Sequence, residues 1–84
     1  MRLAEALEKT GEAHQYVNSH VYLIARWLDR PSEAAKGERV IQVCWYANPG
    51  ANRTRPESED IFVATQFVDH ALQHAHGYSP DGWE

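Results

Sequence analysis

The segment from residue 40 to residue 47, Val-Ile-Gln-Val-Cys-Trp-Tyr-Ala, is apolar on both of its alternating faces, with Gln42 as its one polar residue. A strand of a small antiparallel sheet usually buries one face and exposes the other to water. A strand that is apolar on both faces needs a second cover, from its own chain or from another molecule. Because the chain has only 84 residues, little of it is left to supply that cover. The segment therefore predicts association with a second protein chain.

Composition indicates one small domain. Hydrophobic residues make up 43% of the chain, which is enough for one core, so we expect a single domain over residues 1–84 with residues 78–84 as a C-terminal tail. The single cysteine, Cys44, excludes an internal disulfide and is expected to be buried in its strand. No apolar run is long enough to span a bilayer, and the first residues lack the apolar centre of a signal peptide. These features predict a cytoplasmic protein without a membrane partner.

Charge is unevenly distributed along the chain, whose formal net charge is -4. Residues 30–56 carry five basic and two acidic side chains, whereas residues 57–84 carry six acidic ones and no lysine or arginine. A broad basic surface is therefore not expected, and nucleic-acid binding is disfavoured. The oppositely charged segments either pair with one another, within a chain or across a dimer, or remain solvated.

Residues 2–15 read as a helix, because Leu3, Ala6 and Leu7 fall on one stripe at helical spacing. Gly11 disfavours the interior of a helix and offers an earlier end. The spacing therefore predicts an N-terminal helix that stops at Gly11 or continues to residue 15.

Residues 16–29 fit two periodicities. Alternate residues from Val21 to Leu28 fit a strand that is apolar on both faces, and Val17, Val21, Ile24 and Leu28 also form a helical stripe. Enrichment in tyrosine, valine and isoleucine favours the strand. The turn-rich segment 31–37 then joins it to residues 40–47 as a hairpin.

The fourth predicted element is a helix that begins near Pro56 and continues to about His76. Residues 48–56 have the composition of a loop, and the acids that follow suit the positive end of a helix dipole. Apolar residues then recur at helical spacing from Ile61 to Ala75, and Gly77 is well placed to end the helix. In the tail, Trp83 is expected to pack on the domain rather than to stay exposed for binding a partner.

These elements predict an α+β fold, a small two-layer domain in which an antiparallel hairpin or sheet packs against helices in the order helix, strand, strand, helix. A sheet of two strands is only marginally stable. We therefore expect a third strand from another segment, or extension of the sheet across a dimer.

The predicted interface is the sheet face that the helices do not cover. If the odd-numbered residues from Val21 to Trp27 and from Ile41 to Ala47 face the helices, the even-numbered ones face away. The interface residues are then Tyr22, Ile24, Leu28, Val40, Cys44 and Tyr46. Arg26, Gln42 and His20 accompany them, in a mixture typical of protein interfaces. The alternative is that the N-terminal helix covers this face.

We therefore expect an accessory, adaptor or inhibitor-type protein that binds itself as a homodimer or binds another protein, and that is not an enzyme. The competing hypothesis is a ligand-binding domain or enzyme with a pocket between the sheet and the C-terminal helix. That pocket would be lined by Trp27, Trp45, Phe62, Phe67 and His70. His70 or His20 would supply its polar group.

Metal, cofactor and nucleophile signals are weak. His70 and His74 are spaced for one helical face, with His76 nearby, but no third ligand is specified, so no metal site is predicted. No glycine pattern indicates a nucleotide or another cofactor, and Cys44 lies mid-strand, where thiolates are seldom activated.

Overall fold

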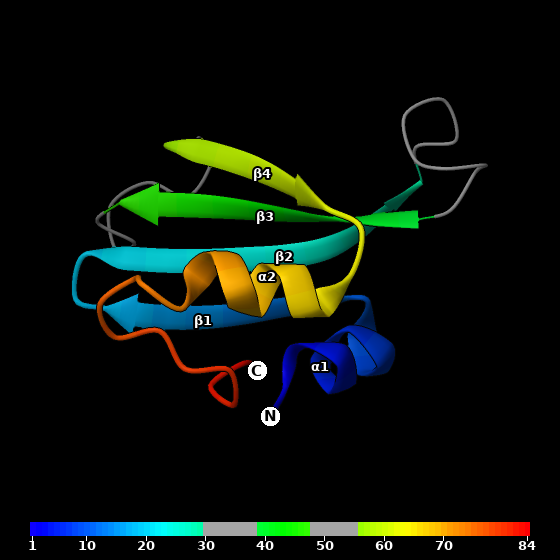
Figure 1. The fold of residues 1–84 in the computed structure, drawn as a ribbon, viewed down its shortest axis with the longest axis horizontal. Coiled ribbons are helices and arrows are strands. Elements are labelled where there is room, and N and C mark those ends of the chain that lie inside the picture. Colours follow the sequence, from blue (N-terminus) through cyan, green and yellow to red (C-terminus); the bar gives the residue numbers. More distant parts are fainter. Residues whose placement is uncertain (30–38, 48–55) are drawn as a thin grey trace.

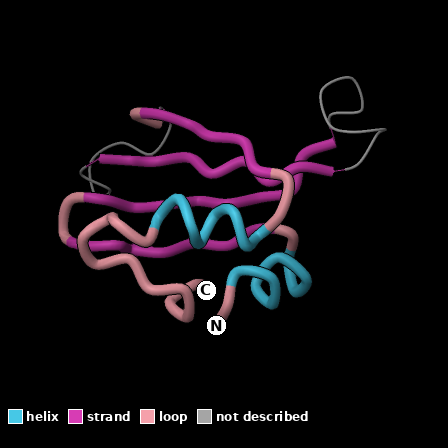
Figure 2. The backbone as a smooth tube through the Cα atoms, viewed as in Figure 1, coloured by secondary structure: helices cyan, strands magenta, loops and turns pink. Residues whose placement is uncertain are grey.

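The computed structural model describes residues 1–29, 39–47 and 56–84. The elements follow in the order α1 (Leu3–Thr10), β1 (Glu12–Asn18), β2 (Val21–Asp29), β3 (Arg39–Ala47), β4 (Ser58–Phe62) and α2 (Thr65–Leu72). The strands form one antiparallel sheet in the order β1-β2-β3-β4, with both helices on one side of it (Figures 1 and 2). The predicted α+β class is confirmed, and two strands are added to the predicted order.

Helix α1 forms because Leu3, Ala6 and Leu7 give it one buried stripe. It ends at Gly11, which takes a left-handed conformation with φ 81° and donates its N–H to the carbonyl of Leu7 at 2.8 Å. Glycine adopts this conformation without the penalty that a Cβ atom imposes. The prediction that the helix reaches residue 15 is therefore wrong, and the shorter helix is correct.

Strand β1 begins directly after Gly11, and only its last residues, 16–18, lay in a predicted strand. Its residues alternate, because Ala13, Gln15 and Val17 are buried whereas Glu12 and Tyr16 are exposed. The turn to β2 is closed by the Asn18 side chain, whose Oδ1 accepts the N–H of His20 at 2.8 Å. Residues 21–29 form β2, so the strand interpretation is confirmed for this part of the ambiguous segment 16–29. The segment is not one strand, because residues 16–18 end β1 and residues 19 and 20 form the turn.

Strands β2 and β3 pair over their whole length, from Val21 opposite Ala47 to Asp29 opposite Arg39. This is the predicted hairpin. The predicted turn at residues 31–37 and most of the predicted loop at 48–56 lie outside the described residues.

The predicted helix from Pro56 to His76 is wrong at both ends. Residues 58–62 form β4, which pairs with β3 from Trp45 opposite Ser58 to Ile41 opposite Phe62. Pairing satisfies the backbone N–H and C=O groups along β3. The free energy gained in this way exceeds what a helix with the same apolar spacing would gain. Helix α2 covers only Thr65–Leu72, so Gly77 lies beyond its end.

The core lies between the sheet and the helices. Each described element except β4 contributes fully buried or nearly buried apolar side chains to it. These are Leu3, Ala6, Leu7, Ala13, Val17, Leu23, Ala25, Ile41, Val43, Val68, Leu72 and Trp83. Trp83 is completely buried, so the predicted packing of the tail is confirmed.

The two ends of the chain lie side by side (Figure 1). The ammonium group of Met1 donates to the carbonyls of Asp81 at 2.7 Å and Trp83 at 2.9 Å, and the N–H of Trp83 donates to the carbonyl of Met1 at 3.0 Å. Next to them, His14 and Glu84 exchange two backbone hydrogen bonds of 2.9 Å. The tail therefore pairs with the outer edge of β1.

Both described helices pack on the same face of the sheet. The buried side chains of α1 belong to the same cluster as those of α2 and Trp83. The alternative that the N-terminal helix covers the opposite face is therefore wrong.

Candidate functional site

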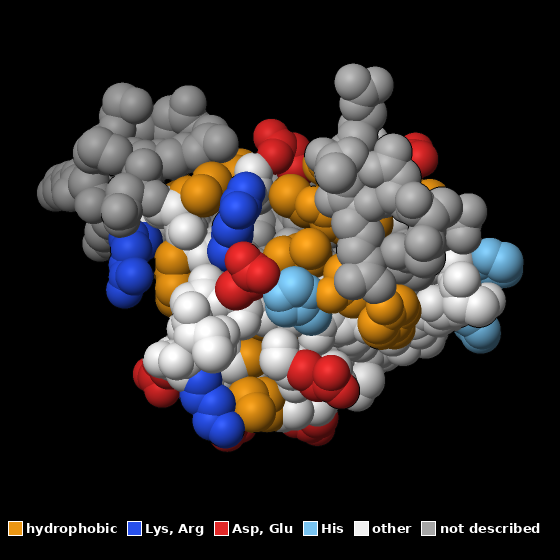
Figure 3. Space-filling model, turned by 180° about the vertical axis from the view of Figure 1, so that it is seen from behind, with side chains coloured by type: hydrophobic (Ala, Val, Ile, Leu, Met, Phe, Trp, Pro, Cys, Tyr) orange, Lys and Arg blue, Asp and Glu red, His pale blue; other side chains and the backbone are white. Residues whose placement is uncertain are grey.

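The sheet face opposite the helices carries side chains of all four strands, and we call it the outer face. The pairing registers place its members in three cross-strand rows and one pair. The rows are Glu12-Arg26-Gln42-Ile61, His14-Ile24-Cys44-Glu59 and Tyr16-Tyr22-Tyr46, and the pair is Leu28-Val40. Apolar, basic, acidic and histidine side chains mix on this side of the molecule (Figure 3).

The row of three tyrosines is the most distinctive part of the outer face. The rings of Tyr16 and Tyr22 have centroids 4.4 Å apart at 48°, and those of Tyr22 and Tyr46 are 6.3 Å apart at 52°. Tyr22 is buried between its neighbours, whereas Tyr16 is 59% exposed. Tilted aromatic pairs at these distances are favourable. The exposed ring of Tyr16 is therefore held in place by its contact with the buried ring of Tyr22.

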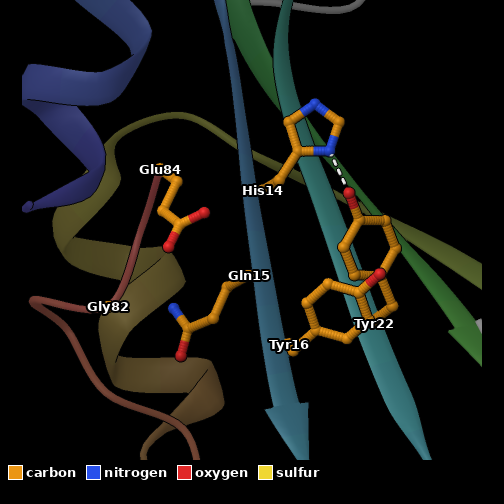
Figure 4. Close-up of a pocket in the computed structure, with 6 residues that line it drawn as sticks. All are labelled: His14, Gln15, Tyr16, Tyr22, Gly82 and Glu84. Carbon is orange, nitrogen blue, oxygen red and sulfur yellow. Dashed lines mark hydrogen bonds between the residues drawn. The ribbon is translucent and has the colours of Figure 1, made fainter.

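A chain of hydrogen bonds joins Glu12, His14 and Tyr22. The Nε2 atom of His14 lies 2.7 Å from a carboxylate oxygen of Glu12, and its Nδ1 atom is hydrogen-bonded to the hydroxyl of Tyr22 (Figure 4). A carboxylate can only accept, so Nε2 carries a proton, and in the neutral imidazole Nδ1 then accepts from the tyrosine hydroxyl. The chain therefore fixes the position of the buried ring on which Tyr16 packs.

A second polar chain crosses the outer face from β2 to β4. Arg26 Nε donates to Gln42 Oε1 at 3.0 Å, and Gln42 Nε2 donates to Glu59 Oε2 at 2.5 Å. Gln42 is buried, whereas Arg26 and Glu59 are exposed. A buried amide thus links the positions of the positive Arg26 and the negative Glu59 on the outer face.

A pocket of about 170 Å³ lies at the outer edge of β1. It is lined by His14, Gln15, Tyr16, Tyr22, Gly82 and Glu84 (Figure 4). Sites for cofactors and drug-sized ligands usually begin at about 300 Å³. The pocket therefore gives little support to a ligand-binding function, and the extended outer face is the stronger candidate site.

The six predicted interface residues all lie on the outer face. Tyr22, Val40 and Cys44 are buried, whereas Ile24, Leu28 and Tyr46 are half-buried. His20 lies instead in the turn between β1 and β2 and is exposed. The sequence therefore placed these six side chains together, and their role in binding stays a prediction.

The five residues of the alternative pocket differ in their surroundings. Trp27, Trp45 and Phe62 pack against the core, whereas Phe67 is 47% exposed and His70 is exposed. The described pocket contains none of the five.

The three candidate metal ligands also lie apart from a common helical face. His70 is in α2, but the helix ends at Leu72, so His74 and His76 belong to the turns that follow. Within residues 1–29, 39–47 and 56–84, no three histidine, cysteine, aspartate or glutamate side chains are grouped as a metal site requires.

Five members of the outer face were missed as site residues by the sequence analysis: Glu12, His14, Tyr16, Glu59 and Ile61. They belong to β1 and β4, where all but Tyr16 lay in segments predicted as helix. The alternation of residues 12–17, polar or aromatic at even positions, was the signal that could have revealed the first three.

The fold and the outer face define a small α+β protein with a four-stranded antiparallel sheet and helices on one side. No family model, curated protein or solved structure matches the chain. None of the described helices is both long and apolar enough to cross a membrane.

Cys44 gives the outer face a measurable pH dependence. Burial raises the pKa of the Cys44 thiol above its ordinary value, and the carboxylate of Glu59 raises this pKa further. As the pH rises, the Cys44 thiol therefore loses its proton in the unfolded chain before it does so in the folded chain. This stabilises the unfolded state, so the free energy of unfolding should fall as the pH rises past about 8.5. Urea unfolding measured at several pH values should show this fall. The Cys44→Ala variant should show a smaller fall over the first pH unit, and equal slopes for the two proteins would contradict the assignment.

Proposed function

We propose that the protein binds protein chains through its outer face, and that a second copy of the chain is the partner, in a homodimer. The observation that carries this proposal is the tyrosine row, which ends in an exposed ring on a face without a described helix. Exposed aromatic side chains on a rigid base are typical centres of protein interfaces.

Charge on the outer face supports a second copy as the partner. A two-fold symmetric interface uses the same surface on both chains, so that surface must complement itself. Arg26 lies between Glu12 on β1 and the Gln42-Glu59 pair on β3 and β4. Rotation of one copy against the other can place the arginine of each chain near a carboxylate of its partner.

Replacing Tyr16 with alanine tests the proposal. The wild-type protein should be a dimer at micromolar concentration in sedimentation velocity, and the Tyr16→Ala variant should dimerise about 30-fold more weakly, as expected for loss of a central aromatic contact. The matched control is Phe67→Ala, which removes an exposed ring from α2 and should leave the dimer unchanged.

Two results would overturn the proposal. One is a wild-type protein that stays monomeric throughout the micromolar range. The other is equal weakening of the dimer by the Tyr16 and Phe67 substitutions, which would place the contact elsewhere or show a general loss of structure.

A further inference from the structure

The two edges of the sheet differ. At one edge, β1 pairs with the tail through the two hydrogen bonds between His14 and Glu84. At the other edge, no described segment pairs with the far side of β4 (Figure 1). Alternate residues of an edge strand direct their backbone N–H and C=O groups away from the sheet, where they can pair with another chain.

Strand β4 is unusually acidic for a strand. Glu57 immediately precedes it, Glu59 and Asp60 lie within it, and all three side chains are exposed. Charge on an edge strand protects against pairing with a second copy. Two β4 strands paired about a two-fold axis at their centres would place Asp60 opposite Asp60, with the other four carboxylates nearby. A second copy is therefore a poor occupant of this edge.

Apolar side chains follow the acidic ones at the end of β4. Ile61, within the strand, is 39% exposed, and Val63, immediately after the strand, is 63% exposed. The register places Glu59 opposite Cys44 and Ile61 opposite Gln42, so Glu59 and Ile61 share the outer face of the sheet. A strand beside β4 would therefore meet carboxylates at one end and apolar side chains at the other.

We infer that the open edge of β4 is a strand-addition site for an extended segment of a partner protein that carries basic side chains at one end and apolar ones at the other. Backbone pairing supplies affinity in such complexes, and alternate side chains supply specificity. The acids that oppose self-pairing are the same groups that select a basic partner. The site does not depend on the proposed homodimer, because a monomer offers the same edge.

A short fluorescent peptide tests this inference. Every second residue of the peptide is threonine, and the residues between the threonines are first two valines and then two lysines. Binding of the peptide to the full chain is measured by fluorescence anisotropy. We expect saturable binding that the double variant Glu57→Lys, Asp60→Lys weakens tenfold or more, since like charges would then face each other. A control variant, Glu5→Lys with Glu8→Lys, makes the same change in net charge on the exposed side of α1 and should leave binding unchanged.

Hydrogen–deuterium exchange distinguishes strand addition from general charge attraction. The bound peptide should slow exchange at the amides of β4 and leave those of α1 unchanged. The inference is overturned by absence of saturable binding, by equal weakening in the two double variants, or by binding without protection of β4. Because Tyr16→Ala leaves β4 intact, it should not affect peptide binding, so failure of the dimer and failure of this site can be told apart.

Discussion

Replacing Trp83 with alanine is expected to lower the free energy of unfolding by about 3–5 kcal/mol, the range for a large aromatic side chain removed from a core. Trp83 has no exposed surface, and its indole N–H donates to the hydroxyl of Tyr78 at 3.1 Å. That hydroxyl in turn donates to Asp69 Oδ1 at 2.5 Å, which ties the tail to α2. Urea unfolding followed by circular dichroism measures the loss.

The Trp83→Phe variant is the control for this prediction. It keeps most of the apolar volume and loses the indole N–H, so its cost should be smaller, about 1–2 kcal/mol. Equal midpoints for the wild type and the alanine variant would contradict the placement of Trp83 in the core.

The second large effect is expected at Gly77, where alanine should destabilise the fold by about 2–5 kcal/mol. Gly77 has φ 93°, and a Cβ atom there would lie 2.1 Å from the carbonyl oxygen of Val17. The neighbouring backbone cannot easily withdraw, because Asn18 Nδ2 donates to the carbonyl of His76 at 2.9 Å. The cost therefore combines a left-handed conformation with a collision against backbone.

Gly11 provides the matched control for Gly77. It has φ 81°, but a Cβ atom there would meet nothing within 4 Å. The Gly11→Ala variant should therefore show only the conformational cost, about 1–2 kcal/mol. If both alanine variants unfold at the same urea concentration, the close approach of Gly77 to β1 is wrong.

The central hairpin could be predicted from sequence because its residues are apolar on both faces and rich in strand-forming types. The strand at residues 40–47, residues 21–29 of the strand preferred over 16–29, and the division of their side chains between two faces are all present in the structure. The burial of Trp83 could also be anticipated, since a large aromatic side chain gains much by leaving water.

The outer strands could not be predicted, for two different reasons. In β1, the core-facing position 15 is occupied by glutamine, whose amide exchanges hydrogen bonds of 3.0 Å with the N–H and carbonyl of Ser79. A polar residue that is satisfied only by the distant tail interrupts the apolar pattern of a strand. In β4, Glu59 and Asp60 have low strand propensity, and pairing with β3 decides the conformation.

Residues of the outer face were predicted as site residues where their strand was predicted, and were missed where it was not. Residues of β2 and β3 were assigned to the outer face correctly, because alternation alone fixes the face of a strand. Glu12 and His14 were missed because the predicted helix extended over them, whereas Tyr16 fell at the start of the strand predicted for residues 16–29. Their hydrogen bonds and ring contacts with Tyr22 depend on the β1-β2 register, which the sequence pattern did not reveal.

The hydrogen bonds between Met1 and residues 81–83 have a consequence for folding kinetics. They join groups separated by 80 and 82 positions, nearly the full length of the chain. Contacts between distant positions carry a large loop-closure entropy and slow the search for the native state. The β2-β3 hairpin can form early from nearby residues, whereas closure of the ends waits until the sheet has brought them together. The rate-limiting barrier should therefore lie before this closure, and variants of Met1 and Trp83 should act mainly on the rate of unfolding.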